Sequence, residues 1–238
     1  MKNRKYVVSI LICLVLMLFV FGGCDTDLNN TYESLKQPAK MTLEENYISY
    51  PEDLNEGDII ELEVPDIVLL DTRGDNKEEI AESFKKEFET QQIYMDDIYV
   101  NEDGKTIMVL TKEQMEKYIC FLNGKYKKAY DNDLPMDTSN VSIEINEDFT
   151  CVNYYVTEDC ELFEHAIMRM WIEPSLAVTQ TILGIPSNEW QVKHTVYYGD
   201  NEVVMLEFYS GANQDGEITG EEWEQKKEEA KTQAKVVE

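Results

Sequence analysis

The sequence predicts an α+β fold, in which an antiparallel sheet is built from repeated β-hairpin-helix units with the helices on one face. Three segments alternate apolar and polar residues on either side of a turn, at 98–110, 143–156 and 190–208. Helical spacing of apolar residues follows the first two of these segments. Both segments turn at an Asn-Glu-Asp triplet, 101–103 and 146–148, and both lead through a threonine into the helix. Hairpins that alternate with helices favour an antiparallel sheet.

A strand and a helix are expected before these hairpins. Residues 59–64 read as a strand that stops before Pro65, because proline cannot continue a central strand. Asp75 is the expected N-cap of the following helix, since Glu78 stands three residues later and completes a capping box. The helix has an apolar residue at every fourth position: Ile80, Phe84 and Phe88.

The first hairpin and the helix after it carry strong local signals. Gly104 follows Asp103 in the turn and supplies the positive φ that such a turn needs. Thr111 is expected to cap the next helix, with Gln114 in the capping-box position. The stripe of this helix that we expect to be buried comprises Met115, Tyr118, Ile119, Leu122 and Tyr126.

The second hairpin leads through Thr157 into a third helix. Pro174 is expected to kink or interrupt this helix, because proline lacks the N–H that the helix needs. Gly184 with Pro186 is expected to end it, and the third hairpin then turns at 199–200. The side of the third helix that we expect to be buried carries Phe163, Ile167, Met170 and Trp171.

The N-terminus has the features of an export signal. Lys2, Arg4 and Lys5 precede an uninterrupted apolar run over 6–21. The run is shorter than the roughly 20 residues of a spanning helix, and charges flank it only on the N-terminal side. A cleaved signal peptide therefore fits better than an uncleaved anchor helix.

Gly22, Gly23 and Cys24 follow the run, and this pattern resembles the lipobox of bacterial lipoproteins. The resemblance implies cleavage before Cys24 and lipidation of its sulfur. Phe21 stands where the usual pattern has leucine, so cleavage by an ordinary signal peptidase nearby, with Cys24 a plain thiol, is the alternative. Two acyl chains hold a protein stably where one chain is marginal. We therefore expect a lipid-anchored protein on the outer, extracytoplasmic face of a bacterial cell membrane.

The chain divides into four parts. Residues 1–23 form the lipoprotein signal peptide, and 24–55 hold the lipidated cysteine and a flexible stalk without hydrophobic periodicity. The α+β domain is expected over 56–210. Residues 211–238 follow as an acidic, mixed-charge loop and helix.

The chain is strongly acidic, with a formal net charge of -27. Removing the basic leader makes the remainder still more negative. A polyanion gains nothing from phosphate groups, so nucleic acid is not expected as a partner. The charge keeps an exported domain soluble, and the alternative is that it attracts divalent cations or a basic partner.

The segment from Leu62 to Thr111 resembles a group of uncharacterised lipoproteins from Gram-positive, Firmicutes-type bacteria with a repeated hairpin-helix domain. The likeness rests on Val64-Pro65, on the helix, and on the run Val100-Asn101-Glu102-Asp103-Gly104-Lys105-Thr106 before Leu110. It spans most of 58–210 and includes a second Asn-Asp-type hairpin and a final one. The resemblance implies a fold and a location, and it implies no activity and no functional residues.

One segment overlays the twelve-residue calcium loop, at 211–222. Oxygen ligands would come from Asn213, Asp215, the Glu217 carbonyl, Thr219 and Glu222. Gly211 stands at the first position, however, where a carboxylate normally anchors the ion. The alternative is an Asp-Gly turn that leads into a charged helix. The expected cofactor is therefore none, with weakly bound Ca²⁺ as the open case.

Histidine and cysteine, which often serve as catalytic base and nucleophile, are sparse in this chain. The chain has two histidines, His165 in the third helix and His194 on the apolar side of a strand. A Cys160–His165 pair is conceivable, yet a spacing of five places the two on different parts of a helix surface, so packing explains both better. Cys120, Cys151 and Cys160 contain no C-x-x-C pair and predict no disulfide framework, although one bridge is open in an exported protein. No catalytic residue is expected.

Aromatic side chains are the other candidates for binding. Strand alternation places about half of them in the core without any ligand. Tyr155 and Tyr197 lie on the sides opposite the apolar residues, so we expect these two to be exposed.

These observations favour a non-enzymatic extracellular binding or interaction module that recognises an unidentified protein, peptide or glycan. The first alternative is a calcium-responsive module that uses the loop at 211–222. The second alternative is an enzyme with an unrecognised site, because the absence of a motif is weak evidence.

Overall fold

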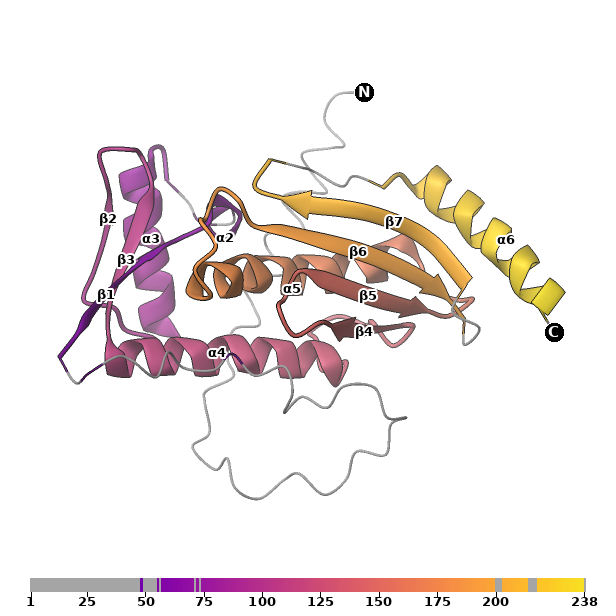
Figure 1. The fold of residues 1–238 in the computed structure, drawn as a ribbon, viewed down its shortest axis with the longest axis horizontal. Coiled ribbons are helices and arrows are strands. Elements are labelled where there is room, and N and C mark those ends of the chain that lie inside the picture. The colour runs from indigo at the N-terminus through magenta and orange to yellow at the C-terminus, as the bar shows by residue number, and fades with distance from the viewer. Residues whose placement is uncertain are drawn as a thin grey trace, which may run out of the picture.

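The computed structural model describes Ile48, Asn55, 57–70, Thr72, 74–199, 203–213 and 218–237, with side chains up to residue 234. The expected signal peptide, Cys24 and most of the stalk lie outside these residues. The fold is α+β, as the sequence predicts. It contains a three-stranded sheet, at the left of Figure 1, and a four-stranded sheet at the right. The prediction of one antiparallel sheet is therefore wrong.

The first sheet has the order β1-β3-β2, and all its pairs are antiparallel. The short helix α2 (Asp66–Leu69) and the longer α3 (Lys77–Thr90) connect β1 to β2. The side chain of Asn76, and not that of Asp75, accepts from the Glu79 N–H at 2.9 Å and caps α3. The strands of this sheet are β1 (Ile59–Glu63), β2 (Asp97–Val100) and β3 (Thr106–Thr111).

Helix α4 (Lys112–Tyr130) confirms its sequence prediction closely. The Thr111 hydroxyl accepts from the Gln114 N–H at 3.3 Å, and the Gln114 amide oxygen accepts from the Thr111 N–H at 2.8 Å. This is the expected capping box. The whole predicted stripe from Met115 to Tyr126 is buried. Local signals set both the start and the inner face of this helix.

The second sheet has the order β4-β5-β6-β7. Its outer pairs are antiparallel hairpins, but β5 and β6 are parallel, with Tyr154 opposite Val196. The parallel pair arises because α5 (Leu162–Ile182) returns the chain to the end at which β5 began. A helical crossover of this kind is what parallel neighbours require. The strands are β4 (Val141–Ile145), β5 (Cys151–Val156), β6 (Gln191–Tyr198) and β7 (Val203–Gly211).

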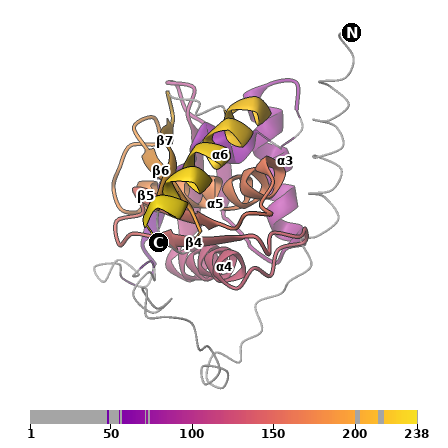
Figure 2. The same cartoon turned by 90° about the vertical axis from the view of Figure 1, so that its right-hand side faces the viewer.

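Helices α5 and α6 (Gly220–Val237) lie on the same side of the four-stranded sheet, and α4 flanks the β4 edge (Figure 2). The rings of His165 from α5 and Trp223 from α6 are 5.1 Å apart between centroids, so the two helices meet over the sheet. Trp223 is fully buried. The C-terminal helix therefore shares the core of the domain.

The prediction for the buried side of α5 is only partly right, because Trp171 is half-buried and packs against the core but two of the predicted residues are exposed. Phe163 is 49% exposed and Met170 is 41% exposed, whereas His165, Met168 and Ile172 are buried. The helix also runs through Pro174 without interruption and ends at Ile182, two residues before Gly184, whose φ is +93°. From residue 175 to 180 every side chain is buried, because α5 is enclosed between the sheet and its neighbouring helices. A helix buried on several sides has no single apolar stripe for the sequence to reveal.

The two Asn-Glu-Asp turns share one local geometry. Asn101 Oδ1 accepts from the Lys105 N–H at 2.9 Å, and Asn146 Oδ1 accepts from the Thr150 N–H at the same distance. Gly104 and Phe149, which occupy the same position in the two turns, have φ of +74° and +59°. The Phe149 ring is buried against Tyr126, which offsets the cost of a left-handed backbone at a non-glycine residue.

Candidate functional site: the open face of the four-stranded sheet

Among the described residues, no helix covers the face of the four-stranded sheet opposite α5 and α6. Strand register arranges its side chains in three rows across β5, β6 and β7. Antiparallel and parallel neighbours in register point to the same side of a sheet, so each row lies on this face, although Thr195 in the second row is itself buried. The rows are Tyr155, Tyr197 and Val204; Asn153, Thr195 and Glu207; and Cys151, Lys193 and Tyr209. We call this surface the open face.

The first row holds a tyrosine pair. The rings of Tyr155 and Tyr197 are stacked, with centroids 5.2 Å apart and planes at 15°. The Tyr155 hydroxyl donates to Glu144 on β4 at 2.7 Å, which fixes the ring relative to the sheet. Strand alternation predicted that both tyrosines lie opposite the apolar residues, and the structure confirms it. Val204 beside them is 49% exposed.

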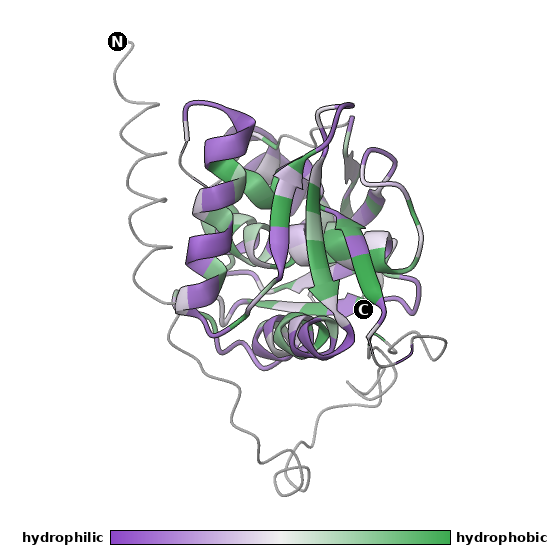
Figure 3. Cartoon of the chain, turned by 90° about the vertical axis from the view of Figure 1, so that its left-hand side faces the viewer, coloured by the Kyte–Doolittle hydropathy of each residue, from purple (hydrophilic) through white to green (hydrophobic). Residues whose placement is uncertain are grey.

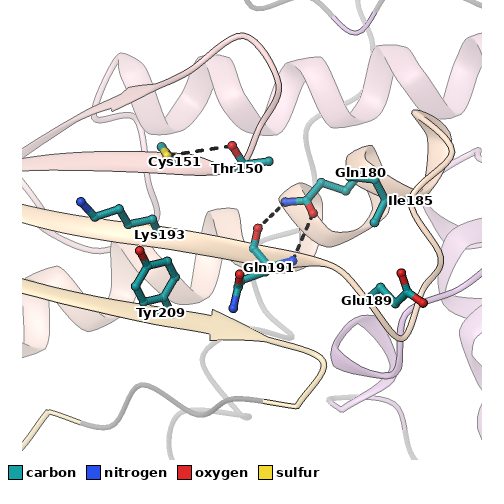
Figure 4. A pocket seen from close by; sticks show the side chains of 8 residues that line it. All are labelled: Thr150, Cys151, Gln180, Ile185, Glu189, Gln191, Lys193 and Tyr209. Atoms are coloured by element: carbon teal, nitrogen blue, oxygen red, sulfur yellow. Dashed lines mark hydrogen bonds between the residues drawn. The ribbon is translucent and has the colours of Figure 1, made fainter.

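The third row opens into a shallow hollow of about 340 Å³ at the end of the sheet (Figure 4). Lys193 and Tyr209 lie side by side along one wall, and Cys151 lies on the neighbouring strand. Gln180 reaches the hollow from α5 and holds both the N–H and the C=O of Gln191, at 3.2 and 3.0 Å. The amide of Gln180 thus fixes the backbone at the start of β6, which borders the hollow.

The covered face contains a buried polar cluster around His194. The Ser210 hydroxyl lies 2.6 Å from His194 Nε2, and the Tyr154 hydroxyl lies 3.0 Å from Nδ1. Glu173 Oε1 is 3.9 Å from the same Nε2, and its other oxygen accepts from Arg169 Nε at 2.9 Å. In a hydrolase triad the carboxylate orients the nitrogen opposite the serine. Here that nitrogen faces a tyrosine, and Ser210 and His194 are buried, so the cluster has the geometry of a structural network.

Electrostatics support a structural role for both histidines. Burial, with a smaller contribution from the charge of Arg169, lowers the pKa of His165 to about 3. Burial and the same arginine, with His165, lower the pKa of His194 to about 3. Both imidazoles are therefore neutral near pH 7. The approach of His194 to Glu173 is then a contact of a neutral ring with a carboxylate, and not an ion pair.

The Cys160–His165 pair is not assembled as a nucleophile. The Cys160 thiol lies 3.5 Å from the Glu161 carbonyl oxygen, to which it donates. Burial raises the pKa of Cys160 to about 12, whereas a nucleophilic cysteine needs a lowered pKa. His165 instead packs edge-on against Tyr154, at 4.6 Å between centroids. Cys120, Cys151 and Cys160 are free thiols.

The candidate calcium loop is described only at its two ends, because Asp215 and Glu217 lie outside the described residues. Asn213 donates from Nδ2 to the Asn188 carbonyl at 3.3 Å. The Thr219 hydroxyl accepts from the Glu222 N–H at 3.1 Å and caps α6. Gly211 ends β7, where an added Cβ would lie 2.7 Å from the Trp190 carbonyl oxygen. The loop is therefore entered from a strand, as predicted, and its first position has no room for a ligating side chain.

The sequence analysis did not identify Ser210 and Glu173 as members of the buried cluster around His194, or Gln180 as a lining residue of the hollow. One signal was available: Arg169 and Glu173 stand four residues apart in the helix, which is the spacing of an ion pair on one side of a helix. Ser210 and Gln180 gave no local signal, because their partners come from distant parts of the chain.

A scan against protein-family models and searches of curated proteins and solved structures found no match. Among the described residues, no helix is both long and apolar enough to cross a membrane. In the same ranges, no group of three or more His, Cys, Asp or Glu side chains is placed to hold a metal ion.

Proposed function

We propose that this chain is a lipid-anchored extracellular binding module, without enzymatic activity, whose open face recognises a glycan. The observation that carries the proposal is the contrast between the two faces of one sheet. Helices α5 and α6 bury most of one face, whereas the other carries a half-buried, stacked tyrosine pair and an exposed tyrosine, Tyr209. Tyrosine side chains at a protein surface are typical of binding sites, because they combine a large apolar ring with a polar hydroxyl group.

The mixture of side chains on the open face favours a saccharide over a protein partner. The core of a protein interface is depleted in charged residues. The open face instead places Asn153, Glu207 and Lys193 among its tyrosines, and Lys193 pairs with Glu207. Amide, carboxylate and ammonium groups can bond sugar hydroxyls, while tyrosine rings can pack on the apolar face of a sugar ring.

The proposed location at the cell surface is supported by the N-terminal segment of the sequence and not by the fold. The basic start, the apolar run over 6–21 and the Gly22-Gly23-Cys24 sequence support export and lipidation at Cys24. The likeness to Gram-positive lipoproteins with a repeated hairpin-helix domain supports the same location. The two Asn-Glu-Asp turns with matching backbone geometry are consistent with such a repeat.

A glycan array tests the proposal. The full chain, solubilised in detergent, would be applied to an array of neutral, acidic and amino sugars. We expect binding to at least one class, and we expect the double variant Tyr155→Ala/Tyr197→Ala to lose at least about tenfold in affinity, since each ring supplies stacking area. Tyr94→Ala is the matched control, because Tyr94 is 52% exposed and lies away from the open face.

Two outcomes would contradict the proposal. Binding to no sugar on the array would remove the glycan as the ligand. Equal losses in the double variant and in Tyr94→Ala would show that the open face is not the binding surface.

A further inference from the structure

A second surface lies at the other end of the molecule, where α3 runs beside the edge strand β2. Between them is a groove of about 600 Å³. Its floor is formed by Ala81 on the helix and by Ile98 and Val100 on the strand. Figure 3 looks at this end and shows hydrophilic residues along the outer side of α3. The groove is separate from the open face.

The backbone of β2 offers unpaired groups to this groove. Strand β2 pairs only with β3, so its other edge is free of strand partners in the described part of the chain. Asn101 N–H donates to the Lys105 carbonyl at 2.9 Å, which makes Asn101 and Lys105 a hydrogen-bonded pair. Such pairs alternate along an antiparallel ladder, so the polar backbone groups of Ile98 and Val100 point away from β3.

Two of the backbone groups that point away from β3 already bond to side chains. Lys85 Nζ donates to the Asp96 carbonyl at 3.0 Å, and the Ile98 N–H donates to Asp97 Oδ1 at 2.8 Å. The Ile98 carbonyl and both backbone groups of Val100 have no such partner among the described residues. These three groups form a short template for another strand.

The rim of the groove is acidic. Four carboxylates, Glu78, Glu82, Glu89 and Asp97, line it together with two lysines. Lys85 is engaged with the backbone at Asp96, and Lys86 pairs with Glu82 at 3.4 Å. Within the described ranges no cation pairs with Glu78 or Glu89. The charge left over is negative, so a second copy of this acidic chain would be repelled and a basic segment attracted.

We propose that the α3–β2 groove binds an extended basic peptide segment, which adds as a strand to the free edge of β2. Main-chain bonds to Ile98 and Val100 supply affinity, and the carboxylates on α3 select basic side chains. Glu78 and Glu89 are eleven positions apart, which is about 16 Å along a helix and matches about five residues of a strand. Alternate side chains face the helix, so a basic residue at every second position fits best.

A peptide titration tests this proposal. The ¹⁵N-labelled full chain in detergent would be titrated with a hexapeptide of alternating lysine and valine, and amide shifts would be followed by NMR. We expect the shifts to concentrate on 97–101 and α3. Val100→Pro should weaken binding by about tenfold, because proline removes an outward N–H that the sheet itself does not use. Glu78→Gln/Glu89→Gln should weaken it by about fivefold through lost charge.

Matched variants distinguish strand addition at β2 from simple charge attraction. Ile59→Pro makes the same substitution on the other edge of the sheet, where Ile59 is 58% exposed, and should leave the affinity unchanged. Glu116→Gln/Glu147→Gln removes the same charge elsewhere and should also leave it unchanged. A peptide with N-methylated central amides should not bind, because it cannot pair as a strand.

Three results would overturn the proposal. The first is that the lysine-valine peptide does not bind. The second is that the N-methylated peptide binds equally well, which would leave charge attraction alone. The third is a concentration-dependent dimer that Val100→Pro dissociates, because a second copy would then be the occupant. Since Tyr155→Ala/Tyr197→Ala does not touch the groove, failure here and failure of the glycan proposal are distinguishable.

Discussion

Two histidines show how polar side chains are held in the core of this protein. His194 is fully buried yet has a hydroxyl group on each ring nitrogen, from Ser210 and Tyr154. His165 is also buried, and its Nε2 has no hydrogen-bond partner among the described residues. A buried imidazole of this kind is stable only while it is neutral, because a charge there would lose its hydration. Acid should therefore weaken the fold through these two residues.

We expect the free energy of unfolding to fall as pH decreases from 6.5 to 5. In the folded chain His165 and His194 have a pKa of about 3, whereas the ordinary value is 6.5. The unfolded chain therefore binds up to two more protons across this interval. The slope should be at most about 2.7 kcal/mol per pH unit. Urea unfolding of the full chain at several pH values measures it.

The carboxylates contribute mostly at lower pH. Glu63, Glu113 and Glu229 have a lowered pKa in the folded chain, so most of their contribution is lost as pH falls through and below their ordinary value of 4.5, and the histidine variants isolate the histidine part of the slope. His165→Gln and His194→Gln should each reduce the slope by about half, whatever they do to absolute stability. An unchanged slope in both variants would refute the assignment.

At the scale of elements, helix starts are set by single side chains. Thr219 caps α6 by accepting from the Glu222 N–H. We expect Thr219→Ala to lower the free energy of unfolding by about 1 kcal/mol, because the variant leaves that N–H without its partner. Thr232→Ala, in the same helix, is the control, since Thr232 only donates to the Glu228 carbonyl within the helix. Chemical unfolding of the two variants should separate them, and equal losses would contradict the cap.

The loop before α6 is expected to be insensitive to calcium. Gly211 is held against the Trp190 carbonyl at the end of β7, and the Thr219 hydroxyl is engaged as a cap. Both features remove ligands from the twelve-residue pattern. The thermal melt of the full chain should therefore be the same in millimolar calcium and in chelator at matched ionic strength. A calcium-specific rise that Glu222→Gln abolishes would contradict this and establish a metal site.

At the scale of the whole molecule, two sheets give the domain two different surfaces. The four-stranded sheet packs one face against α5 and α6, and no described helix covers the other, which is the face that we propose binds a glycan. The three-stranded sheet has a groove beside its β2 edge. If the proposed lipid anchor tethers this chain at its N-terminus, its net charge of -27 keeps both surfaces away from an anionic membrane, which repels it.

The tether itself is tested on cells. We expect the full chain, expressed in a Gram-positive host, to partition with membranes and to incorporate labelled palmitate. Cys24→Ser should shift it to the medium or leave it unprocessed, because the acyl chains hold the protein at the bilayer. Cys120→Ser is the control and should behave as the parent chain. Membrane retention of Cys24→Ser would point to an uncleaved anchor helix.

The accuracy of the sequence predictions depended on how local each feature is. Thr111 with Gln114, the turn at Gly104 and the helix end before Gly184 were predicted correctly, because each involves residues within one turn of chain. Alternation along single strands correctly placed Tyr155 and Tyr197 on the sheet face opposite the apolar residues, but both rings are half-buried because they stack on each other and lie among their neighbours in the sheet. The buried side of α5 was predicted only in part, since its face depends on neighbours from β5, β7 and α6.

The sequence by itself determined most of the helices and strands in this chain, many of their ends and its acidity. Only the tertiary structure decided that the strands form two sheets, that β5 and β6 are parallel, and that His194 meets Ser210 and Tyr154. It also decided which sheet face stays open and which edge borders a groove. The physical reason is that caps and turns depend on bonds between near neighbours, whereas pairing and packing depend on surfaces that distant segments supply.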